Sequence, residues 1–120
     1  MTSDLWSYPD SVGRLDVTGY DVEALDGEIG TVDETSLEAG AGYLVIDTGH
    51  WILGKKVLIP AALVERVDRD AERVYVARAK KEIESAPEFD NDHYTEAAYR
   101  EKVGAYYEAG AMPSETARDT

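Results

Sequence analysis

The stretch Gly42–Pro60, GYLVIDTGHWILGKKVLIP, contains the two most apolar runs of the chain. These runs are Tyr43–Ile46 and Val57–Ile59, both rich in β-branched residues, and the segment between them contains two glycines. Short apolar runs bounded by turn residues are typical of buried strands. The stretch therefore predicts the central pair of strands of a small all-β domain.

Upstream of this pair, two short alternating segments predict a hairpin. Residues 20–24 and 29–32 lie on either side of Asp26-Gly27, and an Asp-Gly between alternating runs indicates a tight turn that requires positive φ. Gly30, inside the second segment, predicts a β-bulge or a close approach of two backbones. The polar residues 33–41 are expected to form a connection.

Downstream, residues 61–63 are too few for a helix and predict a single turn. Residues 64–68 and 73–78 predict two further strands, separated by the polar turn 69–72. The total is five or six short strands with mostly short connections. This pattern favours a mainly β fold, a small barrel or sandwich, in which closure of the sheet removes exposed edges.

The last third of the chain has helical patterning. Residues 79–85 predict one or two helical turns ended by Pro87, and residues 93–109 predict a helix capped by Asp90-Asn91-Asp92 and stopped by Gly110. One face of this helix is apolar and either packs on its own domain or docks a partner, including a second copy. It carries Tyr99, Val103, Tyr106 and Tyr107.

These segments predict four regions. Residues 1–15 form a flexible arm whose aromatic residues Trp6 and Tyr8 are candidates for packing on the domain. Residues 16–86 form the β-domain, residues 87–110 a helical extension, and residues 111–120 a disordered tail.

The charge balance excludes some classes of partner. The chain has 25 acidic and 12 basic residues and a formal net charge of -13. Such a surface repels nucleic-acid phosphates and anionic lipids, so we expect no nucleic-acid or membrane partner. The charge either favours a basic partner or only keeps the protein soluble. The absence of cysteine, of a signal-like segment and of a long apolar run favours a cytoplasmic protein.

Residues 19–78 resemble the PRC-barrel domain, the β-barrel found in the photosynthetic reaction-centre H subunit and in the ribosome-maturation factor RimM. The order of motifs carries the resemblance: DGEIGTV at 26–32, YLVI at 43–46, VLIP at 57–60, V..VD at 64–68 and VYV at 74–76. The motif IESAP at 83–87 and the tyrosine-rich helix that follows are similar to the extension of stand-alone bacterial members.

The resemblance implies a five- or six-stranded PRC-type β-barrel with a C-terminal α-helical extension. It also implies a protein-interaction or assembly module that is not an enzyme, has no catalytic residues and needs no cofactor. The partner would be another protein or a second copy of the chain. The specific roles of the H subunit and of RimM are not implied, because the membrane-spanning helix of the one and the additional domain of the other have no counterpart here.

The run Val45-Ile46-Asp47-Thr48-Gly49 has the form seen in aspartic proteases. That chemistry requires two carboxylates that share a proton, so this chain would need to pair two copies of Asp47. His50-Trp51 replaces the small residue expected after the glycine, which favours a strand ending in a turn. A dimeric aspartic hydrolase is therefore a remote alternative.

The loop at residues 47–51 is the other candidate site. His50 with Asp47 lacks the third and fourth ligands of a closed metal site, so we expect no metal. Trp51 would either cover the open end of the barrel or anchor an interface. The first hypothesis is thus an interaction module with tentative contacts at His50, Trp51, Tyr99, Val103, Tyr106 and Tyr107. The alternative is a protein that binds a small ligand or responds to a metal through residues 47–51 at the barrel mouth.

Overall fold

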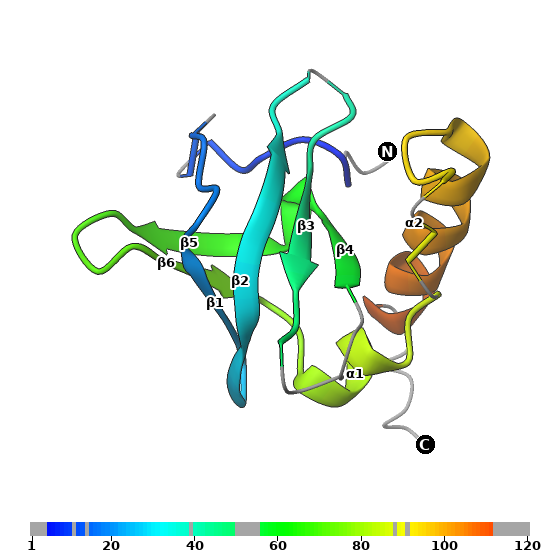
Figure 1. The fold of residues 1–120 in the computed structure, drawn as a ribbon. Coiled ribbons are helices and arrows are strands. Elements are labelled where there is room, and N and C mark those ends of the chain that lie inside the picture. Colours follow the sequence, from blue (N-terminus) through cyan, green and yellow to red (C-terminus); the bar gives the residue numbers. More distant parts are fainter. Residues whose placement is uncertain are drawn as a thin grey trace.

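Six strands form one sheet, and the helices follow them in the chain (Figure 1). The computed structural model describes residues 5–10, 12–13, 15–38, 40–49, 56–87, 89–90 and 92–111. The strands are β1 (Asp21–Ala24), β2 (Gly27–Ser36), β3 (Tyr43–Asp47), β4 (Lys56–Pro60), β5 (Val64–Asp68) and β6 (Arg73–Val76). A single 3-10 turn spans Ala61–Leu63, and the helices are α1 (Lys80–Glu84) and α2 (Ala97–Ala111).

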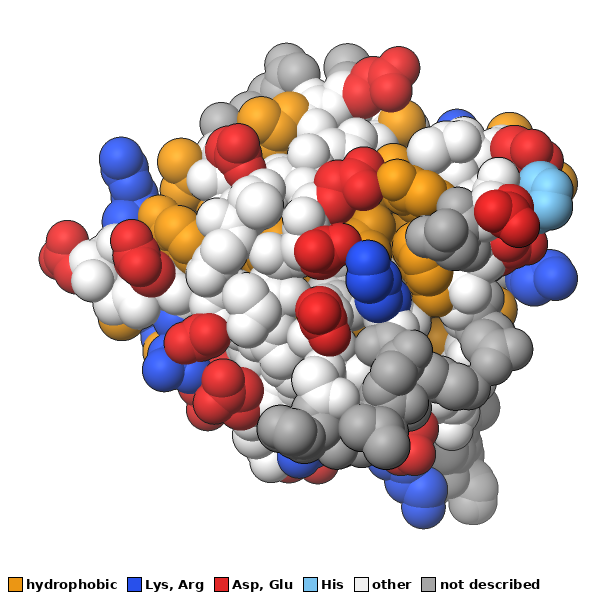
Figure 2. Space-filling model, in the orientation of Figure 1, with side chains coloured by type: hydrophobic (Ala, Val, Ile, Leu, Met, Phe, Trp, Pro, Cys, Tyr) orange, Lys and Arg blue, Asp and Glu red, His pale blue; other side chains and the backbone are white. Residues whose placement is uncertain are grey.

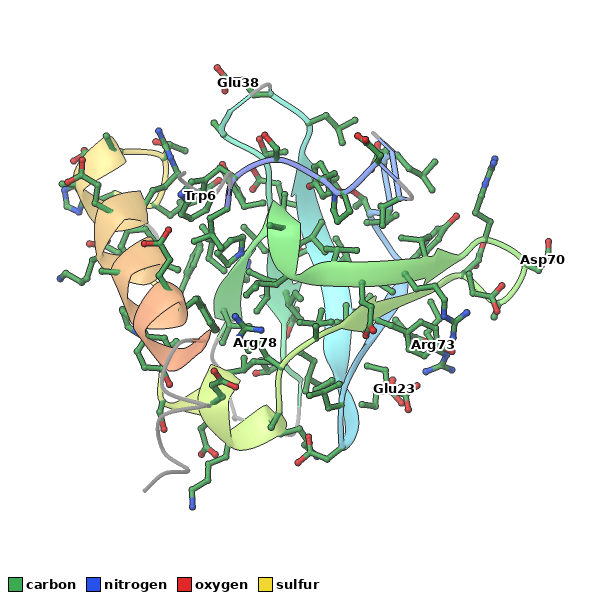
Figure 3. All side chains as sticks on the ribbon, turned by 180° about the vertical axis from the view of Figure 1, so that it is seen from behind. Trp6, Glu23, Glu38, Asp70, Arg73 and Arg78 are labelled. Carbon is green, nitrogen blue, oxygen red and sulfur yellow. The ribbon has the colours of Figure 1, made fainter. Side chains whose placement is uncertain are left out.

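The strand order is β4-β3-β2-β1-β6-β5, and every neighbouring pair is antiparallel except β1 with β6. Glu23 of β1 and Arg73 of β6 form an ion pair across the parallel pair at 3.4 Å (Figure 3). Within the described residues no ladder joins β4 to β5. The prediction of a mainly β fold is confirmed, and the sheet is open between these two strands.

The predicted hairpin is confirmed. Leu25 and Asp26 form the turn between β1 and β2, and Gly27 follows them with a φ of 142°. The pairing of β1 with β2 shifts by one residue, because Val22 pairs with Gly30 whereas Glu23 pairs with Glu28. The shift is a β-bulge beside Gly30, as the isolated glycine predicts.

Residues 33–36 do not form the connection that the sequence predicts. They were expected to belong to a connection, but they extend β2 and pair with β3, after a second register shift between Val32 and Glu34. Their side chains are polar because this end of β2 is only partly buried or exposed. Polar residues on a bulged strand do not give the apolar alternation by which strands are recognised.

Strand β3 is covered on both faces, which explains why its sequence does not alternate. Leu44 and Ile46 point to one face, Tyr43 and Val45 to the other, and all four are buried. On the second face the Tyr94 ring meets the Tyr43 ring edge-on, 6.1 Å between centroids. The segment before α2 therefore covers this face of β3 at Tyr43.

The predicted helix at 93–109 begins later and ends later than expected. Helix α2 begins at Ala97 and continues to Ala111, past Gly110. The Asp90 carboxylate accepts hydrogen bonds from the backbone N–H groups of Asp92 and His93, so it stabilises a turn before the helix and does not cap it. Within the described part of the chain, no helix has the length and apolarity needed to cross a membrane.

Candidate functional site

The predicted interaction residues fall into three groups. His50 and Trp51 lie outside the described residues, as do residues 1–4 and 112–120 of the predicted arm and tail. Tyr99, Val103 and Tyr107 are buried in the core of their own chain. Tyr106 is partly buried, and its hydroxyl donates a hydrogen bond to the Glu82 backbone carbonyl at 2.7 Å. In this chain the apolar face of α2 thus packs on its own domain, alongside β4 (Figure 1).

The described part of the 47–51 loop is a turn. Asp47 is exposed at the end of β3, and its carboxylate accepts a hydrogen bond from the Gly49 N–H at 3.0 Å. Beside it lies a shallow hollow of about 470 Å³, lined among others by Glu28, Thr31 and Thr48. The described residues include no group of three or more His, Asp or Glu residues placed to hold a metal ion.

Next to this hollow, Lys56 of β4 donates a hydrogen bond to the Asp33 carboxylate of β2 at 2.9 Å. The hydrogen bond to Asp33 raises the pKa of Lys56, and the nearby charge of Asp47 acts in the same direction. The ammonium group of Lys56 is therefore paired with the carboxylate of Asp33. Lys55, the other member of the basic pair, lies outside the described residues.

A different site forms where the N-terminal arm crosses the end of the sheet. The Trp6 carbonyl accepts a hydrogen bond from the Gly42 N–H at 2.8 Å, and the Leu5 carbonyl accepts one from the Ala62 N–H at 2.9 Å. The side chain of Leu5 belongs to the core. The two backbone hydrogen bonds, together with the buried Leu5 side chain, fix the path of the arm.

Tyr8 holds the next turn of the arm. Its hydroxyl lies 2.8 Å from the Ser36 carbonyl and 3.2 Å from the Tyr43 carbonyl, so it bridges the ends of β2 and β3. Burial raises the pKa of Tyr8, which keeps the hydroxyl neutral and able to donate. Gly42 permits this contact, because a Cβ at Gly42 would lie 2.8 Å from Cε2 of Tyr8.

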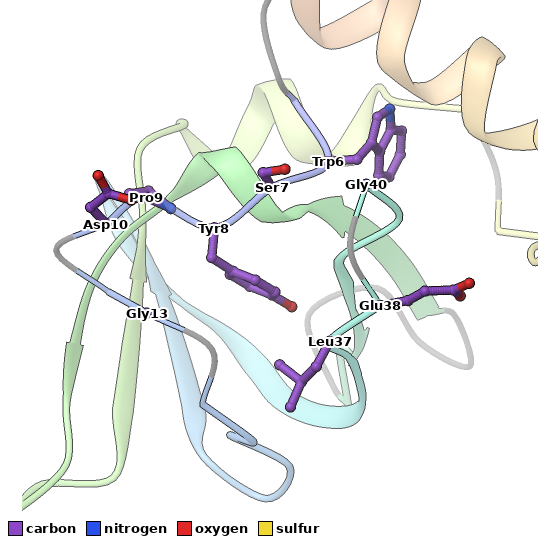
Figure 4. A pocket seen from close by; sticks show the side chains of 9 residues that line it. All are labelled: Trp6, Ser7, Tyr8, Pro9, Asp10, Gly13, Leu37, Glu38 and Gly40. Carbon is purple, nitrogen blue, oxygen red and sulfur yellow. The ribbon is translucent and has the colours of Figure 1, made fainter.

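Between the arm and the β2–β3 connection lies a groove of about 290 Å³, which we call the arm groove (Figure 4). Apolar groups of Trp6, Tyr8, Pro9 and Leu37 line it together with two carboxylates. The described residues that line it are Trp6, Ser7, Tyr8, Pro9, Asp10, Gly13, Leu37, Glu38 and Gly40. The side chain of Tyr8 extends from the arm toward the segment that carries Leu37 and Glu38 (Figure 4).

Asp10 and Glu38 give the arm groove its charge. Both are exposed, and neither forms a hydrogen bond or ion pair through its carboxylate with another residue that the structure describes. Among the described residues of the lining there is no Lys or Arg. Asp10 and Glu38 lie toward opposite ends of the groove, and Glu38 is at the end nearer to Trp6 (Figure 4).

Sequence reasoning identified the aromatic residues of the arm but not the groove. Trp6 and Tyr8 were singled out because one or two aromatic side chains are enough to hold an arm on the domain, and both pack against the core. Leu37 and Glu38 had no such signal, because the groove depends on contacts between residues that are far apart in the chain. No family model matches this chain, and no curated protein matches it.

Proposed function

We propose that this chain is a PRC-barrel-type protein that acts without catalysis as a protein-interaction or assembly module in the cytoplasm. The observation that carries the proposal is the arm groove, an aromatic-lined groove on a hydrogen-bonded scaffold with two carboxylates that are unpaired among the described residues. Interfaces are typically anchored by an aromatic or charged side chain in a preformed pocket of this kind. The partner is another protein or a second copy of the chain.

We infer that the open sheet is a PRC-type barrel in which β4 and β5 face each other across the gap. Two features support this. The 3-10 turn Ala61–Leu63 joins β4 directly to β5, so the two outermost strands are adjacent in the chain. Ile59 of β4 and Val64 of β5 are both almost completely buried, although each lies on an outermost strand. A coiled sheet encloses such residues, whereas a flat sheet leaves its edges exposed.

The experiment is affinity capture with the intact chain, followed by purification of the captured protein and calorimetric titration. An unrelated acidic domain of the same net charge serves as control, because a charge of -13 retains basic proteins non-specifically. We expect a protein enriched over the control that binds at fixed stoichiometry with a Kd of about 10 μM or tighter. Size-exclusion chromatography with light scattering tests for a second copy. A monomer with no partner beyond the control would contradict the proposal.

The second candidate is a small-ligand or metal-responsive protein that uses the hollow beside Asp47. The hollow of about 470 Å³ favours it, and Glu28 and Asp47 place carboxylates in its lining. Thermal unfolding with and without added Ca²⁺, Mn²⁺ or Zn²⁺ tests the metal form, because a ligand that binds only the folded state raises Tm. A rise in Tm that is lost in Asp47→Asn and kept in Asp70→Asn would favour this candidate.

The dimeric aspartic hydrolase remains a remote alternative. It requires the carboxylates of two Asp47 residues to be in contact, which is a property of a dimer and not of this chain alone. Monomeric behaviour in the light-scattering experiment would exclude it.

A further inference from the structure

We propose that the arm groove binds the side chain of an arginine or lysine from a basic segment of a partner protein, with Trp6 and Glu38 as its principal contacts. This inference rests on the proposed interaction function and specifies the chemistry of the partner. A long cationic side chain has an apolar stem and a charged end, and the groove has an apolar wall and an anionic end.

The apolar wall is preformed. Trp6 is partly buried and its carbonyl is hydrogen-bonded to Gly42, while its indole contacts α2 at Gly104, where a Cβ would lie 3.6 Å from Cζ2 and Nε1. The indole is therefore fixed between α2 and the groove. A fixed aromatic face attracts guanidinium and ammonium groups through its quadrupole, and guanidinium groups also stack on it. Because the wall does not have to order on binding, the entropic cost of association is lower.

The anionic end is unoccupied by any cation among the described residues. Glu38 is exposed and lies toward the Trp6 end of the groove (Figure 4), and it forms no ion pair with a cation that the structure describes. Burial and then the charge of Glu34 are the main causes that raise the pKa of Tyr43; the charge of Glu38 adds a smaller contribution, and Arg100 acts in the opposite direction. A carboxylate in the lining of a partly apolar groove can pair with a guanidinium through charge-assisted hydrogen bonds. Asp10, toward the other end, would meet a second positive charge on the same segment.

The size of the groove suits a single side chain. Sites for cofactors and drug-sized ligands usually enclose about 300–1,000 Å³, and the arm groove, at about 290 Å³, lies at the lower limit of that range. A groove of this size accommodates one long side chain and leaves the rest of the partner segment on the surface.

The overall charge has a separate role. Acidic side chains are spread over the face shown in Figure 2 and do not gather in one place. A net charge of -13 attracts basic segments from a distance and speeds their association, but it does not select where they bind. The arm groove supplies that selection, because there a carboxylate, an aromatic face and an apolar wall occur together.

The test is an NMR titration of the intact chain with the peptide Ac-Gly-Arg-Ser-Arg-Gly-NH2. The comparison peptide has both arginines replaced by citrulline, which keeps the shape and removes the charge. We expect saturable shifts at residues 6–10 and 37–42, including the Trp6 indole N–H, with a Kd of about 1 mM or tighter. We expect no saturation with the citrulline peptide.

Three variants assign the site. Glu38→Gln should weaken binding by about 5-fold or more, and Asp10→Asn by a smaller factor, because each removes one charge from the groove. Asp70→Asn is the matched control: it removes the same charge from an exposed residue in the β5–β6 turn, far from Glu38 (Figure 3). Trp6 is left unchanged because its substitution would also disturb packing against α2.

Two results would overturn the inference. One is the absence of saturable shifts at the groove residues. The other is equal weakening in Glu38→Gln and Asp70→Asn, which would mean that the peptide responds only to overall charge. Either result leaves the interaction function standing if affinity capture yields a stoichiometric partner. Failure of the capture experiment together with monomeric behaviour would reject the function, and the peptide titration does not depend on either result.

Discussion

Gly30 of β2 faces the backbone of Asp47 of β3 so closely that a Cβ on Gly30 would lie 2.1 Å from the Asp47 carbonyl oxygen. The φ of Gly30 is 152°, which side-chain-bearing residues rarely adopt. The contact joins the β-bulge of the first hairpin to the end of the central strand. The geometry of the hairpin and the position of the 47–49 turn therefore depend on each other.

The first prediction concerns this contact. Gly30→Ala would force two backbones apart and should cost about 3 kcal/mol or more of unfolding free energy. Gly27→Ala is the matched control: its φ is 142°, but its Cβ would meet only the flexible Lys80 side chain, at 3.5 Å. It should cost about 1–2 kcal/mol. Chemical denaturation measures both, and equal losses would show that the close approach is not what requires Gly30.

The second prediction concerns α2. Gly104 lies in the interior of this helix, and an added Cβ would make only ordinary contacts, 3.4 Å from Cδ2 of Leu5 and 3.6 Å from Trp6. Gly104→Ala should therefore stabilise the protein by about 0.5–1 kcal/mol, because alanine loses less backbone entropy in a helix. Thermal unfolding measures the change. A destabilised variant would mean that the arm packs more tightly on α2 than these distances show.

The third prediction concerns Tyr107, whose side chain is completely buried and whose hydroxyl has no hydrogen-bond partner among the described residues. An unsatisfied buried hydroxyl is unfavourable, so Tyr107→Phe should leave stability unchanged or raise it by about 1 kcal/mol. Tyr107→Ala should cost about 3–5 kcal/mol, because it leaves a cavity in the core. A loss of more than about 1 kcal/mol in Tyr107→Phe would reveal a partner for the hydroxyl, such as a buried water.

The fourth prediction concerns the whole extension. A chain ending after Pro87 loses the buried side chains Tyr99, Val103 and Tyr107 and uncovers the apolar residues beneath them. We expect it to be unfolded or strongly destabilised, with loss of the near-ultraviolet circular dichroism of the full chain. A chain ending after Ala111 keeps α2 and is the control. A truncated chain that remained as stable as the control would place α2 outside the core of the domain.

The fifth prediction is a pH dependence. Nδ1 of His93 and Oδ2 of Asp90 are 3.0 Å apart in an exposed pair. The hydrogen bond to Asp90 raises the pKa of His93 above 6.5, and the same bond lowers the pKa of Asp90 below 3.8. The stability from His93 is present below pH 6.5 and is lost as pH rises through its folded pKa. The stability from Asp90 is present above pH 3.8 and is lost as pH falls through its folded pKa.

The pair therefore stabilises the turn before α2 most between about pH 4 and pH 6.5. NMR titration of the His93 ring should give a pKa above 6.5 in the wild type, and Asp90→Asn should lower it. Added salt should reduce the difference, because the pair is exposed. A wild-type pKa at or below 6.5 would mean that the two side chains are not paired in solution.

Apolar patterning predicted most of the sheet. The strands at 43–47, 56–60 and 73–76 follow from short β-branched runs, and the first hairpin follows from Asp26-Gly27. These signals are local, because burial of alternate residues within one strand suffices to produce them. Gly30 likewise predicted a β-bulge or a close approach of two backbones. The structure has both: a β-bulge beside Gly30 and the close approach of Gly30 to the backbone of Asp47.

Features that depend on distant residues were missed. Asp33 and Glu34 were assigned to a connection because they are polar, yet Glu34 pairs with Val45 and accepts a hydrogen bond from the Tyr94 hydroxyl at 2.8 Å. That bond is the main reason why the pKa of Tyr94 is raised to about 12. The arm groove was missed for the same reason, since Trp6 meets Gly42 only in the folded chain. Sequence patterns within a segment contain no information on such pairs.

We propose that a partner protein binds this chain at the arm groove. The most direct measurement is hydrogen–deuterium exchange of the chain alone and in complex with the purified captured partner. The account predicts slower exchange at residues 5–10 and 37–42 in the complex, with little change in α2. Slower exchange confined to α2, or to residues 27–31 and 47–49, with the arm unchanged, would contradict it.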